Sequence, residues 1–211
     1  MIRELTFSIP IFYHDLKNSN EINRRLKKLI LDWRDEDKGI VKSNVLGWHS
    51  TDDMNVKPQF SFFIDEINNL QNEIHLTEEY ANNTELRIGN VWANVSHKYS
   101  YNRFHNHPGC LWSGVYYVQS PPNCGEILFR IPERDGHLKP IYDDNKTKDE
   151  LHQYDTFVHR PIEGRVIFFP SWLGHEVEQN LTDVEGQDGY RISISFNSLQ
   201  IKKGWRPLLN V

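Results

Sequence analysis

The property of this chain that most restricts its fold is a succession of short apolar segments in its second half. Between residues 86 and 196, segments rich in β-branched and aromatic residues are separated by Gly, Pro and Asn, which favour turns. Such a series predicts a closed or double-sheeted β architecture. The strands predicted are 86–96, 101–107, 111–119, 125–131, 156–160, 164–169, 175–179 and 189–198.

Two helices are predicted before these strands. In one, apolar residues recur every three or four positions between residues 22 and 33, and the other spans about 58–80. Residues 4–12 predict an edge strand, because Pro10 cannot donate a hydrogen bond to a neighbouring strand. Residues 40–58 are expected to be irregular. The predicted fold class is therefore mainly β with N-terminal helices (α+β), with the helices packed on the outside of one sheet.

The chain is expected to form a single domain, 1–211, because this length is sufficient for one substantial core. Its expected parts are an N-terminal strand with supporting helices over 1–83, a β core over 84–199 and a C-terminal tail over 200–211. Residues 132–155 are polar and charged and interrupt the series of strands. They are expected to form either a solvated insertion or a lid over the site.

Composition and charge exclude several classes of partner. Lys and Arg total 24 against 29 Asp and Glu, without a concentrated basic surface, so nucleic acid is not an expected partner. The sequence contains neither a signal-peptide pattern nor an apolar run long enough to span a bilayer, so a cytoplasmic protein without membrane contact is expected. Cys110 and Cys124 are expected to be free thiols. The sequence leaves the oligomeric state open, and a homodimer is compatible with it.

The histidines provide the strongest chemical signal. His105 and His107 are two residues apart in a predicted strand, so their side chains are expected to point to the same face. A third histidine, His175, follows a Gly turn, an apolar strand and a Pro-containing bend that would return the chain to the same place. Three converging imidazoles predict a metal centre.

The last predicted strand has two chemically different faces. We expect its polar face to line a cavity, in which a guanidinium and a neighbouring hydroxyl could bind a carboxylate. The apolar face consists of Ile192, Ile194 and Phe196, and the polar face of Arg191, Ser193, Ser195 and Asn197.

Together these motifs resemble those of the 2-oxoglutarate/Fe(II)-dependent oxygenase superfamily, which carries a His-x-Asp/Glu…His…Arg-x-Ser signature on a double-stranded β-helix, a jelly-roll and cupin-like fold. More narrowly, the chain is similar to a group of such oxygenases in bacteria and their phages, which typically shows a His-x-His-Pro motif. The segments that carry the resemblance are 7–11, 47–50, 105–108, 113–117, 169–175 and 191–197.

The resemblance implies a dioxygenase that uses Fe(II), the cosubstrate 2-oxoglutarate and O2 to hydroxylate a substrate. That substrate, whether a small molecule, a peptide or a protein, is not identifiable from the sequence. The metal ligands implied are His105, His107 and His175, which with Arg191 form the catalytic set. The residues implied for 2-oxoglutarate binding are Arg191, Ser193, Tyr117 and Asn94.

His107 departs from the superfamily pattern, which places a carboxylate two residues after the first histidine. Either all three histidines bind the metal, or His107 lies outside the coordination sphere and a carboxylate such as Glu126 or Glu176 is the third ligand. Histidine-rich sites also suit Zn, Ni and Cu. The alternative function is that of a cupin-like metal protein, a dioxygenase or isomerase that does not use 2-oxoglutarate, because residues 164–175 resemble half of a cupin motif.

Overall fold

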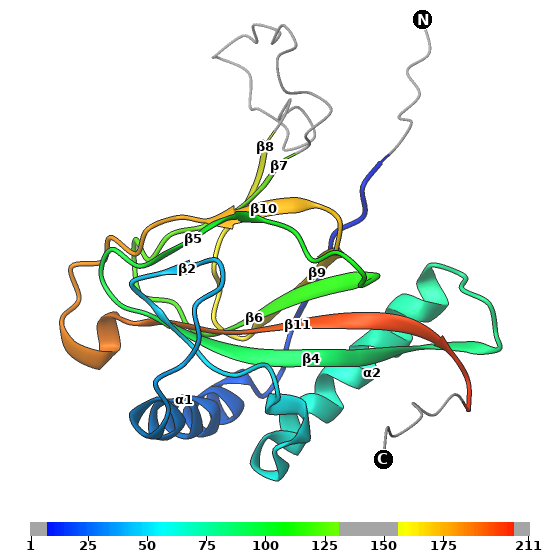
Figure 1. Ribbon diagram of the computed structural model, residues 1–211, viewed down its shortest axis with the longest axis horizontal. Helices are drawn as coiled ribbons and strands as arrows, with labels where there is room; N and C mark the ends of the chain where they lie inside the picture. Colours follow the sequence, from blue (N-terminus) through cyan, green and yellow to red (C-terminus); the bar gives the residue numbers. More distant parts are fainter. Residues whose placement is uncertain (1–7, 131–155, 205–211) are drawn as a thin grey trace, which may run out of the picture.

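The structure is a computed structural model that describes residues 8–130 and 156–204 (Figure 1). The proposed lid at 132–155 lies outside the described residues. So do the first part of the predicted strand 4–12 and most of the tail at 200–211.

The described residues form two antiparallel sheets, which together with two helices confirm the predicted fold class. The larger sheet has the order β1-β9-β6-β11-β4-β3 and the smaller one β2-β5-β10-β7-β8. The larger sheet comprises β1 (Phe12–Asp15), β9 (Arg165–Pro170), β6 (Trp112–Gln119), β11 (Arg191–Lys202), β4 (Thr84–Ser96) and β3 (Trp48–His49). The smaller sheet comprises β2 (Asn44–Val45), β5 (Tyr101–His105), β10 (Gly174–Val177), β7 (Ile127–Arg130) and β8 (Thr156–His159).

All eight strands predicted after residue 84 are present, as β4 to β11, with ends shifted by a few residues. The strand predicted over 4–12 is wrong in its described part, because residues 8–11 are not in a strand and the edge strand β1 begins only at Phe12. Two further predictions are wrong in part. The segment 40–58 contains the short strands β2 and β3, and β5 ends at His105, so His107 lies beyond the strand.

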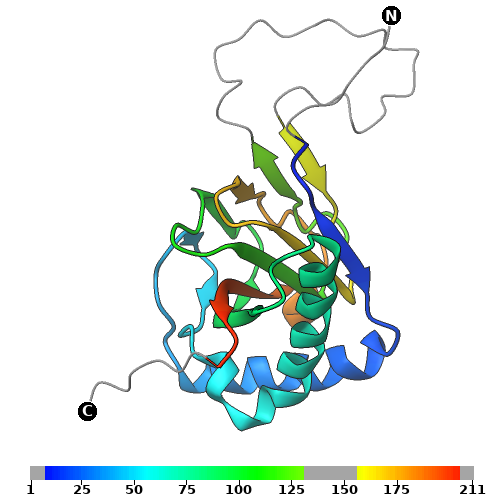
Figure 2. The same ribbon diagram turned by 90° about the vertical axis from the view of Figure 1, so that its right-hand side faces the viewer.

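The helices α1 (Ser19–Glu36) and α2 (Ser61–Thr77) pack on the outer face of the larger sheet, as predicted (Figure 2). Two short 3-10 helices, η1 (Met54–Val56) and η2 (Pro58–Phe60), lead into α2. Tyr116 of β6 contacts both helices: its hydroxyl donates to Asn23 Oδ1 at 2.7 Å, and its ring lies 4.9 Å from that of Phe63. The apolar stripe of α1 is buried there, because burying such a stripe is the main stabilisation available to a surface helix.

The apolar side chains form two clusters, one on each face of the larger sheet. The larger cluster lies between this sheet and the helices and includes the apolar face of β11. A smaller cluster, which includes Val115, Phe129 and Phe169, lies between the two sheets. Ile192, Ile194 and Phe196 are therefore fully buried beneath the helices, and the polar face of β11 points into the space between the sheets.

Candidate metal centre

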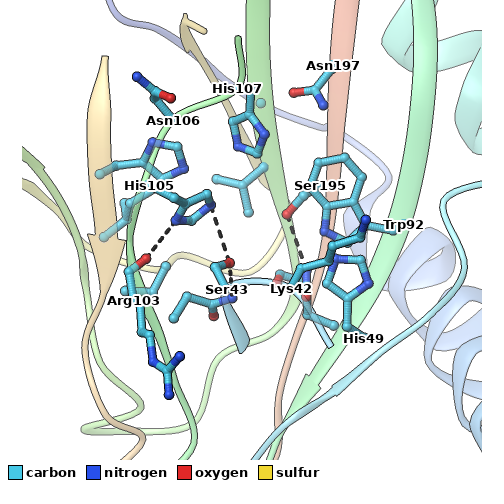
Figure 3. Close-up of a pocket in the computed structure, with 18 of the residues that line it drawn as sticks. Lys42, Ser43, His49, Trp92, Arg103, His105, Asn106, His107, Ser195 and Asn197 are labelled. Atoms are coloured by element: carbon cyan, nitrogen blue, oxygen red, sulfur yellow. Dashed lines mark hydrogen bonds between the residues drawn. The ribbon is translucent and has the colours of Figure 1, made fainter. Parts of the chain in front are cut away.

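A cavity of about 530 Å³ lies between the two sheets, and polar side chains from both sheets line it (Figure 3). On the larger sheet, alternate residues of β4 and β11 face this cavity, as expected for strands whose side chains point alternately to opposite faces. The cavity brings together all the site residues predicted from the sequence. These are His105, His107, His175, Arg191, Ser193, Tyr117 and Asn94.

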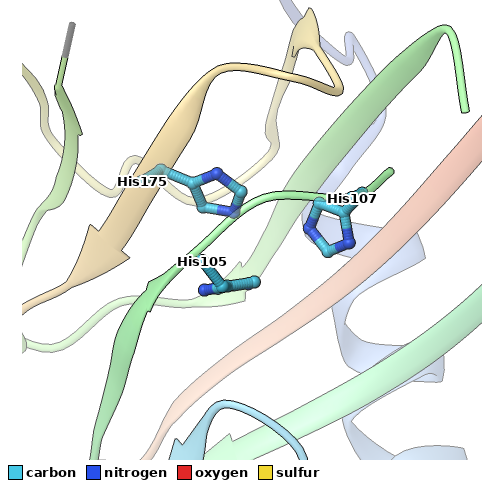
Figure 4. Close-up of side chains that lie close together, drawn as sticks. All are labelled: His105, His107 and His175. Atoms are coloured by element: carbon cyan, nitrogen blue, oxygen red, sulfur yellow. The ribbon is translucent and has the colours of Figure 1, made fainter. Parts of the chain in front are cut away.

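The three histidines converge on one point (Figure 4). One ring nitrogen from each histidine lies within 4.8 Å of those from the other two, and the rings of His105 and His175 have centroids 4.3 Å apart. His105 and His175 are direct partners across β5 and β10. His107 joins them from the following loop, where its backbone N–H donates to Ser171 O at 2.9 Å. In the part of the chain that the structure describes, this is the single group of three or more His, Cys, Asp or Glu side chains that could hold a metal ion.

A bulge in β5 directs His105 into the cavity. On β10, His175 and Val177 are two residues apart, but their partners on β5, His105 and Asn102, are three apart. Both partners contact Ser43, whose Oγ accepts from Asn102 Nδ2 at 3.2 Å and lies 3.4 Å from His105 Nε2. The extra residue therefore brings Asn102 and His105 to the same side of the strand, which strict alternation would not do.

Backbone carbonyls fix the tautomers of two of these histidines. His105 Nδ1 lies 2.7 Å from Arg103 O, and His175 Nδ1 lies 3.0 Å from Leu173 O. A carbonyl oxygen can only accept, so Nδ1 carries the hydrogen in both rings and Nε2 keeps the lone pair that a metal requires.

Burial favours the neutral form of all three imidazoles. It lowers the pKa of His105, and it lowers the pKa of His175 to about 3. The pKa of His107 is lowered to about 4, by burial and then by the charge of His105. Because a metal ligand must be unprotonated, these histidines are available as ligands at neutral pH without releasing protons.

The two carboxylates considered as alternatives to His107 have cationic partners elsewhere. Glu176 Oε1 accepts a hydrogen bond from Arg130 Nη2, and Glu126 Oε1 lies 3.3 Å from Arg160 Nε. Neither glutamate belongs to the histidine cluster. The geometry therefore favours three histidines over two histidines and a carboxylate.

Arg191 provides a buried cation in the wall of the same cavity. Its side chain is 2% exposed, and Nη1 donates to the carbonyl oxygens of Cys124, Gly125 and Glu178. Its Nη2 is buried and has no hydrogen-bond partner among the residues that the structure describes. Burial lowers the pKa of Arg191, but arginine remains protonated in proteins. An unpaired buried cation is costly, so this group fits an anionic ligand such as a carboxylate.

Tyr117, Ser193 and Asn94 lie side by side on β6, β11 and β4, because Ser193 is the register partner of both other residues. Tyr117 is buried on the cavity side of β6, and burial raises its pKa above the ordinary value. Asn94 Nδ2 donates to Ser195 Oγ at 3.3 Å, and its Oδ1 is buried without a partner among the described residues. These groups offer polar atoms to a ligand next to Arg191.

Several residues that line the cavity were not predicted as site residues from the sequence, and two of them form an aromatic stack. His49 of β3 stacks on Trp92 of β4 with ring centroids 5.5 Å apart, and Trp92 in turn lies 5.7 Å from His107. The alternation of residues 90, 92 and 94 along the predicted strand was the signal available for Trp92. His49 lay in a segment expected to be irregular, so its direction could not be predicted.

Comparison with known families identifies one match. The model of the family described as "Putative 2OG-Fe(II) oxygenase" matches residues 90–197, a span that contains every predicted site residue. A search of curated proteins gave no match.

None of the helices within residues 8–130 and 156–204 has the length and apolar character needed to cross a membrane.

Solved structures of 2-oxoglutarate oxygenases share the fold. A Pseudomonas putida prolyl-4-hydroxylase is 12% identical with a TM-score of 0.60, over 91% of this chain and 93% of that chain. A Trichoplax adhaerens prolyl hydroxylase, in complex with a hypoxia-inducible-factor peptide fragment, is 12% identical with a TM-score of 0.59 (90% and 83% covered). HygX from Streptomyces hygroscopicus, with nickel and 2-oxoglutarate bound, is 13% identical with a TM-score of 0.56 (90% and 82% covered). The shared fold is the double-stranded β-helix expected from the sequence.

Proposed function

This chain belongs to the 2OG-Fe(II) oxygenase family, and we propose that His105, His107 and His175 hold its Fe(II) while Arg191 holds its 2-oxoglutarate. When bound, iron and 2-oxoglutarate supply the oxidising chemistry, in which O2 is consumed, a substrate C–H bond is hydroxylated, and succinate and CO2 are released. The observation that carries the assignment is the convergence of three neutral imidazoles in one cavity with a buried guanidinium that has a free Nη2.

The donor set fits Fe(II). Two of the three histidines are held as Nδ1–H tautomers, so their Nε2 atoms keep the lone pair needed to coordinate, although His105 Nε2 also lies 3.4 Å from Ser43 Oγ. Three protein ligands leave further positions open for small molecules. All three ligands are neutral, so the charge of the iron would be offset chiefly by the 2-oxoglutarate dianion.

The remaining groups of the cavity fit 2-oxoglutarate. Arg191 Nη2 and the hydroxyls of Ser193 and Tyr117 would bind its distal carboxylate through charge-assisted hydrogen bonds. Apolar side chains of the smaller cluster, among them Ile127 and Phe169, line the same cavity and would exclude water from the bound dianion.

The size of the cavity supports a small substrate. A volume of about 530 Å³ is within the range of sites for small molecules, and 2-oxoglutarate would fill part of it. One structural relative was solved with a peptide bound and another with 2-oxoglutarate and nickel. We therefore propose that the reacting group is a small molecule or a single side chain of a peptide that enters the cavity.

The test is anaerobic addition of 2-oxoglutarate to Fe(II)-loaded protein, with iron content measured in parallel. We expect the weak visible charge-transfer absorption of iron chelated by a keto acid. His107→Ala should reduce iron affinity by at least tenfold, and His107→Asp should retain iron, because it restores the carboxylate common in the superfamily. His97→Ala is the control, since His97 lies outside the cavity and its Nδ1 contacts Lys98 O.

Two outcomes would contradict this assignment. If folded, iron-loaded protein shows neither the absorption band nor 2-oxoglutarate binding, the proposed use of this cavity is wrong. If His107→Ala binds iron as tightly as the unmodified protein, His107 is not a ligand.

A further inference from the structure

The cavity is polarised along the length of β4 and β11. In the register of these strands, Arg191 lies opposite Ser96 at one end and Asn197 lies opposite Asn90 at the other. Six residues of extended strand separate Arg191 from Asn197, which corresponds to about 20 Å. The groups that line the two ends are chemically different.

The end nearer Arg191 carries positive charge. Lys42 and Arg103 line the cavity, and neither forms an ion pair among the residues that the structure describes. Figure 3 shows Arg103 on the side of the cavity away from Asn197, and Lys42 in the middle, beside Trp92 and His49. Arg191 and Arg103 therefore favour an anion away from Asn197, as the proposed 2-oxoglutarate site requires.

At the opposite end of the cavity, successive side chains form a series of hydrogen bonds that all run in the same direction. Ser113 Oγ donates to Asn197 Oδ1 at 2.7 Å, and Asn197 Nδ2 donates to Asn90 Oδ1 at 3.0 Å. Asn90 Nδ2 then donates to Asp52 Oδ2 at 3.3 Å. Every donor in this series points toward Asp52, so the side-chain amides of Asn197 and Asn90 are fixed in orientation. The carboxylate of Asp52 is the terminal acceptor.

Asp52 is the last acceptor in this series of hydrogen bonds, and its carboxylate remains available to a ligand. It lines the cavity, and no Lys, Arg or His among the described residues forms an ion pair with it. Among the described residues its single side-chain partner is the amide of Asn90 at 3.3 Å, and that bond occupies only Oδ2 of the exposed carboxylate. The series of hydrogen bonds that orients Asp52 begins at buried side chains, because Asn197 is 5% exposed and Ser113 is 1% exposed.

We propose that Asp52, Asn90 and Asn197 bind a cationic nitrogen of the substrate, an ammonium or a guanidinium. This rests on the proposed function, because 2-oxoglutarate at the Arg191 end leaves the Asp52 end for the substrate. A cationic donor would pair with Asp52 Oδ1, and the remaining lone pairs of the two amide oxygens would accept its other N–H groups. Trp92, which lies between this end and His107, offers an aromatic face to the same charge.

The charges of the cavity explain why a cation is favoured over an anion at this end. An anionic substrate would be repelled by the Asp52 carboxylate, which has no ion-pair partner among the described residues. A neutral polar substrate would satisfy the amides but would lack the electrostatic attraction that an ammonium or guanidinium gains from the exposed Asp52 carboxylate.

The test compares matched probes on Fe(II)-loaded protein saturated with 2-oxoglutarate under anaerobic conditions. The cationic probes are Nα-acetyl-L-arginine amide, Nα-acetyl-L-lysine amide and a capped tripeptide with a central lysine. Their uncharged partners are Nα-acetyl-L-citrulline amide, Nα-acetyl-L-norleucine amide and the same tripeptide with norleucine, and Nα-acetyl-L-glutamate amide is the acidic probe. Binding is measured by calorimetry and by the change in the charge-transfer absorption of the iron complex.

We expect at least one cationic probe to bind tenfold or more tightly than its uncharged partner. Asp52→Asn, which removes the charge but not the shape, should abolish this preference and leave the Kd for 2-oxoglutarate within about twofold. Asp183→Asn is the matched control, because Asp183 is exposed, pairs with Lys98 and does not line the cavity. It should change neither quantity.

Three results would overturn the inference. They are equal binding of the cationic and uncharged partners (including no binding by either), tighter binding of glutamate, and a cation preference that persists in Asp52→Asn. A failure of the proposed function is distinguishable from these, because it appears as a missing 2-oxoglutarate complex before any probe is added.

Discussion

Tyr116 and Tyr117 are adjacent on β6 but face opposite sides of the larger sheet, so their hydroxyls have different roles. The Tyr117 side chain faces the cavity, next to Ser193 in register. Tyr117→Phe should raise the Kd for 2-oxoglutarate by roughly tenfold, because a hydrogen bond to a charged group contributes about 1.5–3 kcal/mol. The fold should be unaffected. Calorimetric titration of the metal-loaded protein measures the change.

Tyr116→Phe is the control for this prediction. It removes the bond from the Tyr116 hydroxyl to Asn23 Oδ1 and leaves a buried acceptor unsatisfied. The free energy of unfolding should therefore fall by about 1–3 kcal/mol, while the Kd for 2-oxoglutarate stays unchanged. If the two variants affect 2-oxoglutarate equally, Tyr117 does not contact it.

The site residues predicted from the sequence all line the cavity, but the reasons for their convergence could not be predicted. His105 and His107 were expected to share a face of one strand. In the structure, β5 ends at His105, and the loop after it places His107 through its bond to Ser171. The bulge that directs His105 depends on the pairing of β5 with β10, which is a long-range contact. Periodicity within one segment contains no information about such contacts.

At the scale of elements, the packing of β6 against β11 depends on Gly114. A Cβ at this position would lie 2.2 Å and 2.4 Å from ring atoms of Phe196 and 2.8 Å from Ile167 O. Gly114→Ala should lower the free energy of unfolding by about 1–3 kcal/mol, because Phe196 is fully buried and cannot move away without disturbing the core. Urea denaturation measures this difference.

Gly89→Ala on β4 is the matched control. Its new Cβ would meet atoms no closer than 3.6 Å, which is ordinary van der Waals contact. The free energy of unfolding should change by no more than about 0.5 kcal/mol. A loss for Gly89→Ala as large as that for Gly114→Ala would show that the strands, rather than the Phe196 contact, reject a side chain.

The long elements were predictable and the short ones were not. The apolar stripe of α1 and the strict alternation of β11 repeat often enough to identify the element and its buried face. β2 and β3 contain two residues each, and neither is long enough to show a period. They are strands because they pair with β5 and β4, and this pairing brings Ser43 and His49 to the cavity.

At the scale of the whole molecule, the larger sheet separates two environments. Its outer face is apolar and is covered by the helices, and its inner face carries the smaller apolar cluster together with the polar residues that line the cavity. The buried His175 and the half-buried His105 and His107 lie in the second environment, where loss of solvent opposes their protonation. The stability of the metal-free protein should therefore depend on pH.

The sign of this dependence follows from the histidine pKa values. The pKa of His107 is about 4 and that of His175 is about 3 in the folded protein, against an ordinary value of 6.5 in the unfolded chain. Between these values the unfolded chain binds more protons, so the free energy of unfolding should fall as the pH decreases below about 6.5 and should level off only near pH 3.

The substitution His107→Gln isolates the contribution of His107 to the slope of the free energy of unfolding against pH. In metal-free protein between about pH 6 and pH 4.5, the free energy of unfolding should fall less steeply than in the unmodified chain, by up to about 1.4 kcal/mol per pH unit. Urea denaturation at several pH values measures both slopes, with His97→Gln as the control because His97 lies outside the cavity. Equal slopes for His107→Gln and the unmodified chain would mean that His107 is protonated in the folded protein, as readily as in water, and would remove the electrostatic basis for treating it as a neutral ligand.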